Sequence, residues 1–389
     1  MRILTFSTLY PNAARPGHGP FVEHRLRQLV GSGAVSASVI APVPWFPFRN
    51  KAFGDYADFA AAPRAETRHG LEIVHPRYPV VPKVGMNLAP ALLERFSRTA
   101  VDRELARHPD TALIDAHYFY PDGVAAAAHG LRTGKPVVIT ARGTDISLIP
   151  QYRRPRQKIL WAARQAAAII TVCEALKLAL VDLGVPADRI TVLRNGVDFE
   201  IFRPVPKQQA RARTLMNGRT LLSVGHMIER KGHHLVIEAL TRLPDTNLVI
   251  VGDGPMHQEL VTQVASARLG DRVRFAGRIA QDQLPDYYSA ADALLLASSR
   301  EGMANVLLES LACGTPVVAT PVWGTPEVIA DPAAGVLSAD RSAGAIAAAV
   351  RQLFDNYPDS DATLAYARQF SWEATTAGQI ELFRRISGH

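Results

Sequence analysis

The carboxylates of Glu301 and Glu309 have the residue type and spacing best suited to binding a ligand with several hydroxyls. They follow an apolar, strand-like run at 293–297 and precede Gly314-Thr315-Pro316, which should end the next helix. A carboxylate can accept hydrogen bonds from two adjacent hydroxyls, as on a sugar or a ribose. We expect Glu301 to lie in a turn beside Gly302, and Glu309 to lie on the helix that follows.

The start of this helix is a candidate anion site. The first N–H groups of a helix have no partner within it, and the helix dipole favours negative charge there. The expected backbone donors to a diphosphate are those of Asn305, Val306 and Leu307. The two glutamates would then bracket a ligand that runs over the helix start. The alternative is that Glu301 is a solvated turn residue and that Glu309 belongs to a local network.

A basic turn follows another strand-like run, at 220–224. Arg230 offers a planar fork and Lys231 a point charge, which together suit a diphosphate. Both this turn and Glu301 follow predicted strands, so both are expected at the carboxyl edge of one parallel sheet, where open α/β sheets bind ligands. A solvated basic turn is the alternative, and the matching positions of the two segments favour binding.

Two candidates lie in the first half of the chain. His117 ends a strand-like run and is expected to face a cleft, where a histidine can donate to a substrate hydroxyl or shield developing charge. A purely structural histidine fits the sequence equally well. Gly19 lies in a loop after the first strand, where glycine lets the backbone approach a phosphate. This loop lacks the G-x-G-x-x-G pattern, and the segment 252–257 has histidine at the third glycine position, which disfavours a nicotinamide cofactor.

No metal or other cofactor is expected. The D-x-D segment Asp359-Ser360-Asp361 follows Pro358 near a predicted helix start, where an N-cap is favoured over a metal site. The sequence has no zinc-type spacing of cysteine and histidine.

Short apolar runs alternate with helical patterns, which predicts βαβ units and parallel sheets. The expected strands are Ile3–Ser7, Ser38–Ala41, Ala112–Ala116, Val137–Thr140, Ala168–Val172, Ile190–Leu193, Thr220–Val224, Asn247–Val251, Val273–Ala276, Ala293–Ala297 and Val317–Thr320. The fold class is therefore α/β, with two Rossmann-like doubly wound domains facing a cleft, a common place for small-molecule sites. The domains are expected at 1–199 and 219–370, with a polar linker at 200–218 and a C-terminal helix at 371–389 that crosses back to the first domain.

The composition is that of an ordinary globular protein. The 389 residues are 48% hydrophobic and 20% charged, and no apolar run reaches the roughly 18 residues that span a bilayer. The N-terminus enters a strand pattern without a secretory signal, and Cys173 and Cys313 are interpreted as buried thiols, so a cytoplasmic location is expected. The net charge of +7 favours acidic partners such as nucleotide phosphates or anionic lipid. Nucleic acid is disfavoured because the sequence lacks the interleaved aromatic and basic motifs typical of proteins that read single-stranded nucleic acid.

The sequence contains few signals for the residues that would bind a second substrate or a membrane. The segment 45–51, WFPFRNK, mixes aromatic and basic side chains and could enter a membrane interface or hold a lipid-linked acceptor. A locally packed surface loop is the alternative. Arg153, Arg154, Arg156 and Lys158 form a basic cluster that could meet anionic lipid at the inner face of the membrane, or be a solvated helix start.

Together these segments resemble the retaining, nucleotide-sugar-dependent glycosyltransferases of family 4, which have the GT-B fold. Glu301 and Glu309 are similar to that family's E-x7-E motif, and Arg230-Lys231-Gly232 to its basic turn for the donor diphosphate. Three further segments carry the resemblance: Asn195-Gly196-Val197-Asp198, which ends the first domain, Gly277-Arg278-Ile279, the loop at the nucleobase, and Arg142-Gly143-Thr144-Asp145, an H-G-x-D loop with arginine in place of histidine.

The resemblance implies that Glu309 binds the donor ribose and Glu301 the hydroxyls of the transferred sugar. It places His117 near that sugar, Gly19 in a loop that closes on the phosphates, and Ile279 beside the base. The implied reaction is metal-independent transfer of a hexose from a nucleoside diphosphate sugar to a glycan or lipid-linked acceptor, with retention of configuration and no dedicated side-chain base. The segment 10–22 is similar to members that build cell-surface polysaccharides.

Two other classes remain open from the sequence. A sugar-nucleotide epimerase of the same architecture would turn over the donor without an acceptor. A non-catalytic nucleotide binder would use the same basic residues without turnover.

Overall fold

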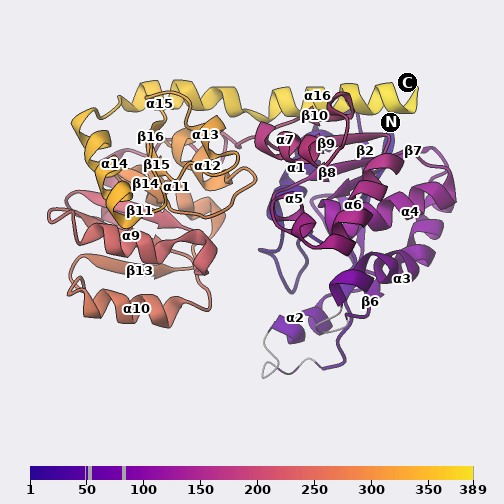
Figure 1. Cartoon of the computed structure of the whole chain (residues 1–389), viewed down its shortest axis with the longest axis horizontal. Coiled ribbons are helices and arrows are strands. Elements are labelled where there is room, and N and C mark those ends of the chain that lie inside the picture. Colours follow the sequence, from indigo (N-terminus) through magenta and orange to yellow (C-terminus); the bar gives the residue numbers. More distant parts are fainter. Residues whose placement is uncertain (49, 51–54, 81–84, 389) are drawn as a thin grey trace. The chain divides into compact units, whose positions relative to one another are not determined.

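The computed structural model describes residues 1–48, 50, 55–80 and 85–388. The chain forms two compact units (Figure 1). The first contains Met1–Asn195 together with Glu373–His389, and the second contains Gly196–Trp372. In the described residues, no helix has both the length and the apolar character needed to cross a bilayer.

The first unit is built on an eight-stranded sheet with the order β10-β9-β8-β7-β1-β2-β5-β4. All neighbouring strands pair in parallel except β4 and β5, which are antiparallel. The strands are β1 (Arg2–Phe6), β2 (Ser36–Ile40), β4 (Ala65–Arg68), β5 (Leu71–Val74), β7 (Thr111–His117), β8 (Val137–Ala141), β9 (Ala168–Thr171) and β10 (Ile190–Val192), with a separate pair β3 (Val43–Pro44) and β6 (Arg77–Tyr78).

Helices cover this sheet because its central strands are apolar on both faces. The helices of the first unit are α1 (Pro20–Gly31), α2 (Asp55–Ala61), α3 (Gly85–Arg107), α4 (Val124–Thr133), α5 (Thr144–Ser147), α6 (Arg153–Gln165), α7 (Glu174–Asp182) and α16 (Trp372–Ser387). The last helix joins the first unit's core through Leu382 and Phe383, which pack with Val22, Leu26 and Leu193. Cys173 and Cys313 are buried and form no disulfide, which confirms their interpretation as thiols.

The second unit is built on a parallel six-stranded sheet with the order β13-β12-β11-β14-β15-β16. Its strands are β11 (Thr220–Val224), β12 (Asn247–Val251), β13 (Val273–Gly277), β14 (Ala293–Leu296), β15 (Val317–Ala319) and β16 (Gly335–Leu337). Its helices are α8 (Lys207–Thr214), α9 (His233–Leu240), α10 (His257–Ser266), α11 (Leu284–Ala290), α12 (Asn305–Ala312), α13 (Thr325–Val328), α14 (Ala343–Asp355) and α15 (Ser360–Ala367). The α/β class and the predicted strands are confirmed; the sequence missed β3–β6 and β16, which are short or lie towards sheet edges.

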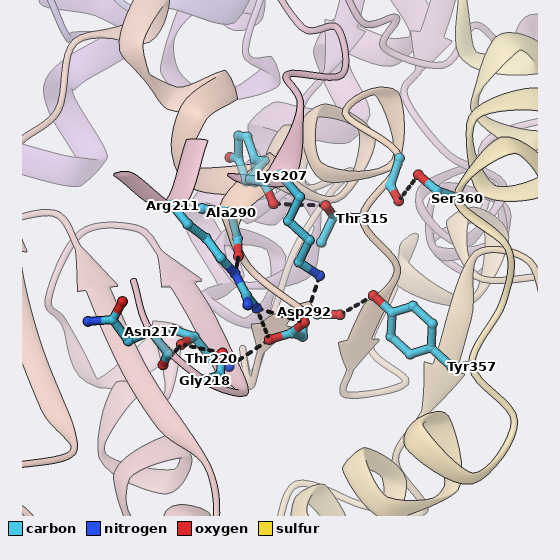
Figure 2. Close-up of polar contacts among 12 residues, drawn as sticks. Lys207, Arg211, Asn217, Gly218, Thr220, Ala290, Asp292, Thr315, Tyr357 and Ser360 are labelled. Atoms are coloured by element: carbon cyan, nitrogen blue, oxygen red, sulfur yellow. Dashed lines mark hydrogen bonds and ion pairs between the residues drawn. The ribbon is translucent and has the colours of Figure 1, made fainter. Parts of the chain in front are cut away.

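The segment predicted as a linker, 200–218, is not free chain, because α8 forms within it and packs on α11. Asp292, at the amino end of β14, fixes the helix (Figure 2). Its carboxylate lies 2.6 Å from Lys207 Nζ and 2.9 Å from Arg211 Nη2, and the backbone N–H of Thr220 donates to it at 2.7 Å. A run of lysine, glutamine and arginine is typical of a solvated linker. The helix forms here because its basic side chains pair with Asp292, which is distant in the sequence, so the residues of the segment do not indicate this contact.

Candidate functional site

Each sheet has a switch point, where two neighbouring parallel strands are not consecutive and the strand order changes direction. The predicted site residues follow the strands beside these switch points. In the second sheet the order reverses between β11 and β14; the basic turn follows β11, and Glu301 follows β14. In the first sheet it reverses between β7 and β1; His117 ends β7, and Gly19 follows β1. Chain connections leave such a switch point towards opposite faces of the sheet, which makes its carboxyl edge the usual ligand site.

Glu301 and the basic turn are in direct contact in the second unit. Lys231 Nζ donates to Glu301 Oε1 at 2.7 Å, and Arg230 Nη1 lies 3.3 Å from the same oxygen. The Ser298 hydroxyl also donates to Oε1, at 2.7 Å. Burial alone would raise the pKa of Glu301, but the charges of Lys231 and Arg230 outweigh it and hold the pKa below its ordinary value. The other oxygen, Oε2, receives no hydrogen bond from the described residues and can accept from a ligand hydroxyl.

Glycine is required where the basic turn meets the chain that follows β14. Gly232 has φ of +73°, and a Cβ there would lie 2.0 Å from the carbonyl oxygen of Ala297. This close approach lets Ser299 N–H donate to the Arg230 carbonyl at 2.8 Å, and Arg230 Nη1 donate to the Arg300 carbonyl at 2.8 Å. The turn that carries the cations is thus packed directly on the loop that carries Glu301.

Glu309 lies on α12, where one carboxylate oxygen accepts a 2.7 Å hydrogen bond from the hydroxyl of Tyr288. Burial raises the pKa of Glu309 to about 7, although the Tyr288 hydrogen bond and the charge of Lys231 act in the opposite direction. The second oxygen of Glu309 receives no hydrogen bond from the described residues. Both glutamates therefore have one oxygen held by the protein and one available to a ligand. Gly302 is buried next to Glu301.

The start of α12 offers fewer free donors than predicted. The N–H of Leu307 donates to the Ala304 carbonyl at 3.1 Å, so this group already has a partner, and its contact with an anion stays a prediction. The N-cap residue is Ala304, and its methyl side chain cannot accept a hydrogen bond from the first N–H groups of the helix. A backbone carbonyl accepts from Leu307 instead. Val306 N–H has no partner in the described chain and stays a candidate, as does Asn305, which begins the helix.

The loop after β13, predicted to lie at the nucleobase, begins next to two other strand ends. Ile279 is half-buried, two residues beyond β13. Arg278 Nη1 lies 3.6 Å from Asp253 Oδ2, and His226 Nδ1 lies 3.5 Å from Asp253 Oδ1, with all three side chains exposed. These residues follow β13, β12 and β11 and form a polar border at the carboxyl edge.

His117 does not present a free ring nitrogen. Arg142 Nη2 donates to Nδ1 at 2.7 Å, so the ring proton is on Nε2, which lies 3.1 Å from Asp115 Oδ2. Burial lowers the pKa of His117 to about 4, and the side chain is only 1% exposed. Arg142 and Asp115 thus occupy both ring nitrogens, so a hydrogen bond from His117 to a substrate hydroxyl would have to displace one of them; that contact stays a prediction.

This histidine belongs to a buried polar network that the sequence did not reveal. Gln379 of α16 donates to Asp115 Oδ2 at 3.3 Å and accepts from Arg25 Nε at 2.8 Å. Arg142 also donates to Asn195 Oδ1, at 3.1 Å. The network joins residues from both ends of the chain, so no local spacing could have indicated it.

Gly19 adopts φ of +69° at the N-cap of α1. A Cβ there would lie 2.5 Å from the Leu9 carbonyl oxygen, so this position needs glycine for the packing of its own loop. The contact with phosphate stays a prediction.

The described residues contain no group of three or more histidine, cysteine or acidic side chains placed to hold a metal. Asp359 is the N-cap of α15 and accepts from the N–H of Asp361 at 3.2 Å, which confirms that interpretation of the D-x-D segment.

Both halves of the chain match known protein families. Residues 206–370 match the family described as glycosyl transferases group 1, and residues 52–201 match glycosyltransferase family 4. The chain is 30% identical over 342 residues to TuaC of Bacillus subtilis, assigned as a teichuronic acid biosynthesis glycosyltransferase; the match covers 83% of this chain and 82% of TuaC.

Two solved structures have the same fold. Sucrose-phosphate synthase of Thermosynechococcus elongatus has a TM-score of 0.80 at 20% identity, covering 100% of this chain and 99% of that one. HepE of Anabaena, in complex with UDP and glucose, has a TM-score of 0.74 at 21% identity and covers 98% of both chains. The protein is therefore of the GT-B class, with two Rossmann-like domains. It belongs to glycosyltransferase family 4 and is a glycosyltransferase.

Proposed function

We propose that this enzyme transfers a hexose from a nucleoside diphosphate sugar to a hydroxyl of a glycan or lipid-linked acceptor, in the synthesis of a polysaccharide or glycolipid. The observation that carries the proposal is the Lys231–Glu301 pair at the switch point of the second sheet, which puts a cation for the diphosphate beside a carboxylate with an oxygen free for a sugar hydroxyl. The donor class is supported by HepE of Anabaena, whose structures contain UDP or UDP-glucose. Polysaccharide synthesis is supported by the likeness to TuaC.

In this reaction the difficult step is loss of the diphosphate, which leaves oxocarbenium character on the sugar. Arg230, Lys231 and the start of α12 would stabilise the charge on the leaving group, so we expect no metal requirement. We further propose that the acceptor attacks the face from which the diphosphate departs, that the leaving phosphate takes the acceptor proton, and that configuration is retained without a side-chain base.

The experiment that tests the proposal is thermal shift and nucleotide release across uridine, guanosine and adenosine diphosphate sugars, with EDTA present. Stabilisation by one donor, followed by slow release of its nucleoside diphosphate, would support a metal-independent transferase. Absence of a shift with every donor, in protein shown to be folded, would contradict it. Epimerisation of the donor sugar without release of the nucleotide would show that the protein is an epimerase and not a transferase.

The pH dependence of donor binding should report on Glu309. Its pKa is raised to about 7, and a ligand whose ribose hydroxyls donate to the carboxylate favours the ionised form. Donor affinity should therefore rise with pH, by about tenfold between pH 6 and pH 8. An intact nucleotide sugar is the right probe, because its diphosphate diester does not titrate in this range. Titration calorimetry should give a flat profile for Glu309→Gln; the same slope in the variant would exclude Glu309 as the source.

The acceptor is proposed to bind the first unit. A cavity of about 600 Å³ there is lined by Trp45, Phe46, Phe59, Arg64 and Arg77 among others. Aromatic faces suit sugar rings, and the exposed Arg64 suits an anionic substituent. Arg49 and Lys51 of the predicted aromatic–basic segment lie outside the described residues.

We also propose peripheral contact with an anionic membrane. Met86, Leu88 and Phe96 of α3 are 39–49% exposed, and Tyr152, just before α6, is 51% exposed. The Lys158 ammonium on α6 donates to the Asn87 carbonyl on α3. This contact joins the start of α3, with Met86 and Leu88, to the start of α6, with the exposed Arg153, Arg154 and Arg156; Phe96 lies further along α3. Apolar and basic side chains together suit an anionic bilayer surface.

Vesicle flotation tests this contact. The protein should bind vesicles that contain an anionic phospholipid, and Phe96→Ser combined with Arg154→Glu should abolish binding. Leu178→Ser, which changes a 56% exposed leucine on α7, is the matched control and should still bind. Failure of the unmodified protein to float would reject the membrane contact.

A further inference from the structure

Arg341, in the segment between β16 and α14, bonds both parts of the donor site from outside it. Its Nε donates to the Ala297 carbonyl at 3.0 Å, and its Nη2 donates to the Glu229 carbonyl at 2.9 Å. Nη2 also lies 3.0 Å from Glu229 Oε1. One guanidinium therefore holds two segments that are far apart in sequence.

These two segments carry the residues assigned to the donor. Glu229 immediately precedes Arg230 and Lys231, and Ala297 is four residues before Glu301. The Ala297 carbonyl held by Arg341 is the one on which Gly232 packs so closely that a Cβ would reach within 2.0 Å. Arg341 thus fixes the surface against which the basic turn is seated.

The chemistry of the contact explains why an arginine is present. Its planar fork can donate to two carbonyls in fixed directions, whereas the ammonium of lysine is a single point on a flexible stem. The ion pair between Arg341 and Glu229 adds little stability to this contact, since the Glu229 side chain is 67% exposed and water screens such pairs. The two bonds to backbone carbonyls therefore matter most.

We propose that Arg341 is a positioning residue for the donor site, which holds the turn at 229–231 against the loop at 297–301 so that Lys231 stays in contact with Glu301. This inference rests on the proposed function, because it gains its meaning from the roles of those two residues. Displacement by about 1 Å at a reacting centre can lower a rate by two orders of magnitude. The Lys231–Glu301 contact depends on such a placement, since each residue belongs to a different segment.

The experiment compares Arg341→Met with Arg351→Met. Arg351 lies on α14 and donates to the Arg242 carbonyl at 2.7 Å, so this control loses the same kind of bond in the same unit, without any contact to the donor segments. Donor and acceptor kinetics, affinity for the nucleoside diphosphate product, and Tm are measured for both. Arg341→Met should lower kcat by roughly tenfold and weaken nucleotide binding, with the acceptor KM unchanged and a Tm close to that of the control.

Two further variants make the result specific. Glu229→Gln should be close to the unmodified enzyme in kcat, because only the exposed ion pair is lost. Arg341→Lys keeps charge and stem but not the fork, so it should be folded and still reduced in kcat. Equal kinetics in Arg341→Met and Arg351→Met, or full activity in Arg341→Lys, would overturn the inference.

A comparison with Lys231→Met distinguishes failure of the role inferred for Arg341 from failure of the proposed function. If Lys231→Met loses activity while Arg341→Met does not, the positioning role fails and the donor site stands. If Lys231→Met is fully active, the assignment of the donor site fails, and the role inferred for Arg341 fails with it.

Discussion

Replacing Lys231 by methionine should lower the rate of sugar transfer by about two to three orders of magnitude, the scale seen when a preorganised donor to a developing negative charge is removed. The ammonium would no longer stabilise the departing diphosphate. Its removal would also take away a 2.7 Å partner of Glu301 and raise the pKa of that carboxyl, because Lys231 is the larger of the charges that lower it. Steady-state transfer assays at saturating donor measure the effect, and Arg230→Met should fall similarly.

Lys207→Met provides a matched control for this change. Lys207 pairs with Asp292 at 2.6 Å (Figure 2), at the amino end of β14. Glu301 follows the carboxyl end of the same strand. Both variants lose one lysine–carboxylate contact beside one strand, and only Lys231 lies at the edge assigned to the donor. A transfer rate in Lys231→Met equal to that of the unmodified enzyme would reject the assignment, as would an equal loss in both variants.

Gly232→Ala should destabilise the second unit by about 3 kcal/mol or more. Two costs add: a non-glycine residue is strained at φ of +73°, and its Cβ would lie 2.0 Å from the rigid carbonyl oxygen of Ala297. For a unit of this size, we expect the midpoint of thermal unfolding to fall by roughly 6–12 °C. Any protein that folds should also bind the donor more weakly, because relief of the contact separates the basic turn from the loop that carries Glu301.

Gly218→Ala isolates the first of these costs. Gly218 has φ of +64°, and its nearest neighbour to an added Cβ is the Asn247 side chain at 3.7 Å, an ordinary contact. This variant should cost about 1 kcal/mol and leave donor affinity unchanged. Calorimetry on both variants measures the difference; equal shifts would show that the Ala297 contact relaxes without cost.

The sequence by itself determined the α/β class, the positions of the main strands and the edge at which the candidate residues lie. These features are local: runs of valine, isoleucine and leucine predict buried strands, and a residue that follows a parallel strand must lie at the carboxyl edge. Glu301 and Lys231 were found in this way, because each lies in the turn that follows a recognisable strand, and Glu309 was found from its spacing to Glu301 along the next helix.

Only the tertiary structure decided which atoms of these residues are available. Lys231, Arg230 and Ser298 occupy one oxygen of Glu301, Tyr288 occupies one oxygen of Glu309, and both ring nitrogens of His117 are bonded. Ser298 and Asp115 are near their partners in sequence, but Lys231, Arg230, Tyr288 and Arg142 belong to other elements of the fold, so the residues around each candidate do not indicate them. Burial and pairing depend on these distant neighbours.

The same reason explains the remaining differences. The helix in the predicted linker is ordered by Asp292, and the turn that carries the cations is held by Arg341, each more than 70 residues away along the chain. The periodicity of apolar residues indicates which face of a helix or strand is buried. It does not indicate which distant atom will form a hydrogen bond with a given side chain. The sequence therefore determined where the site lies, and the packing of the fold determined which of its groups are free to bind.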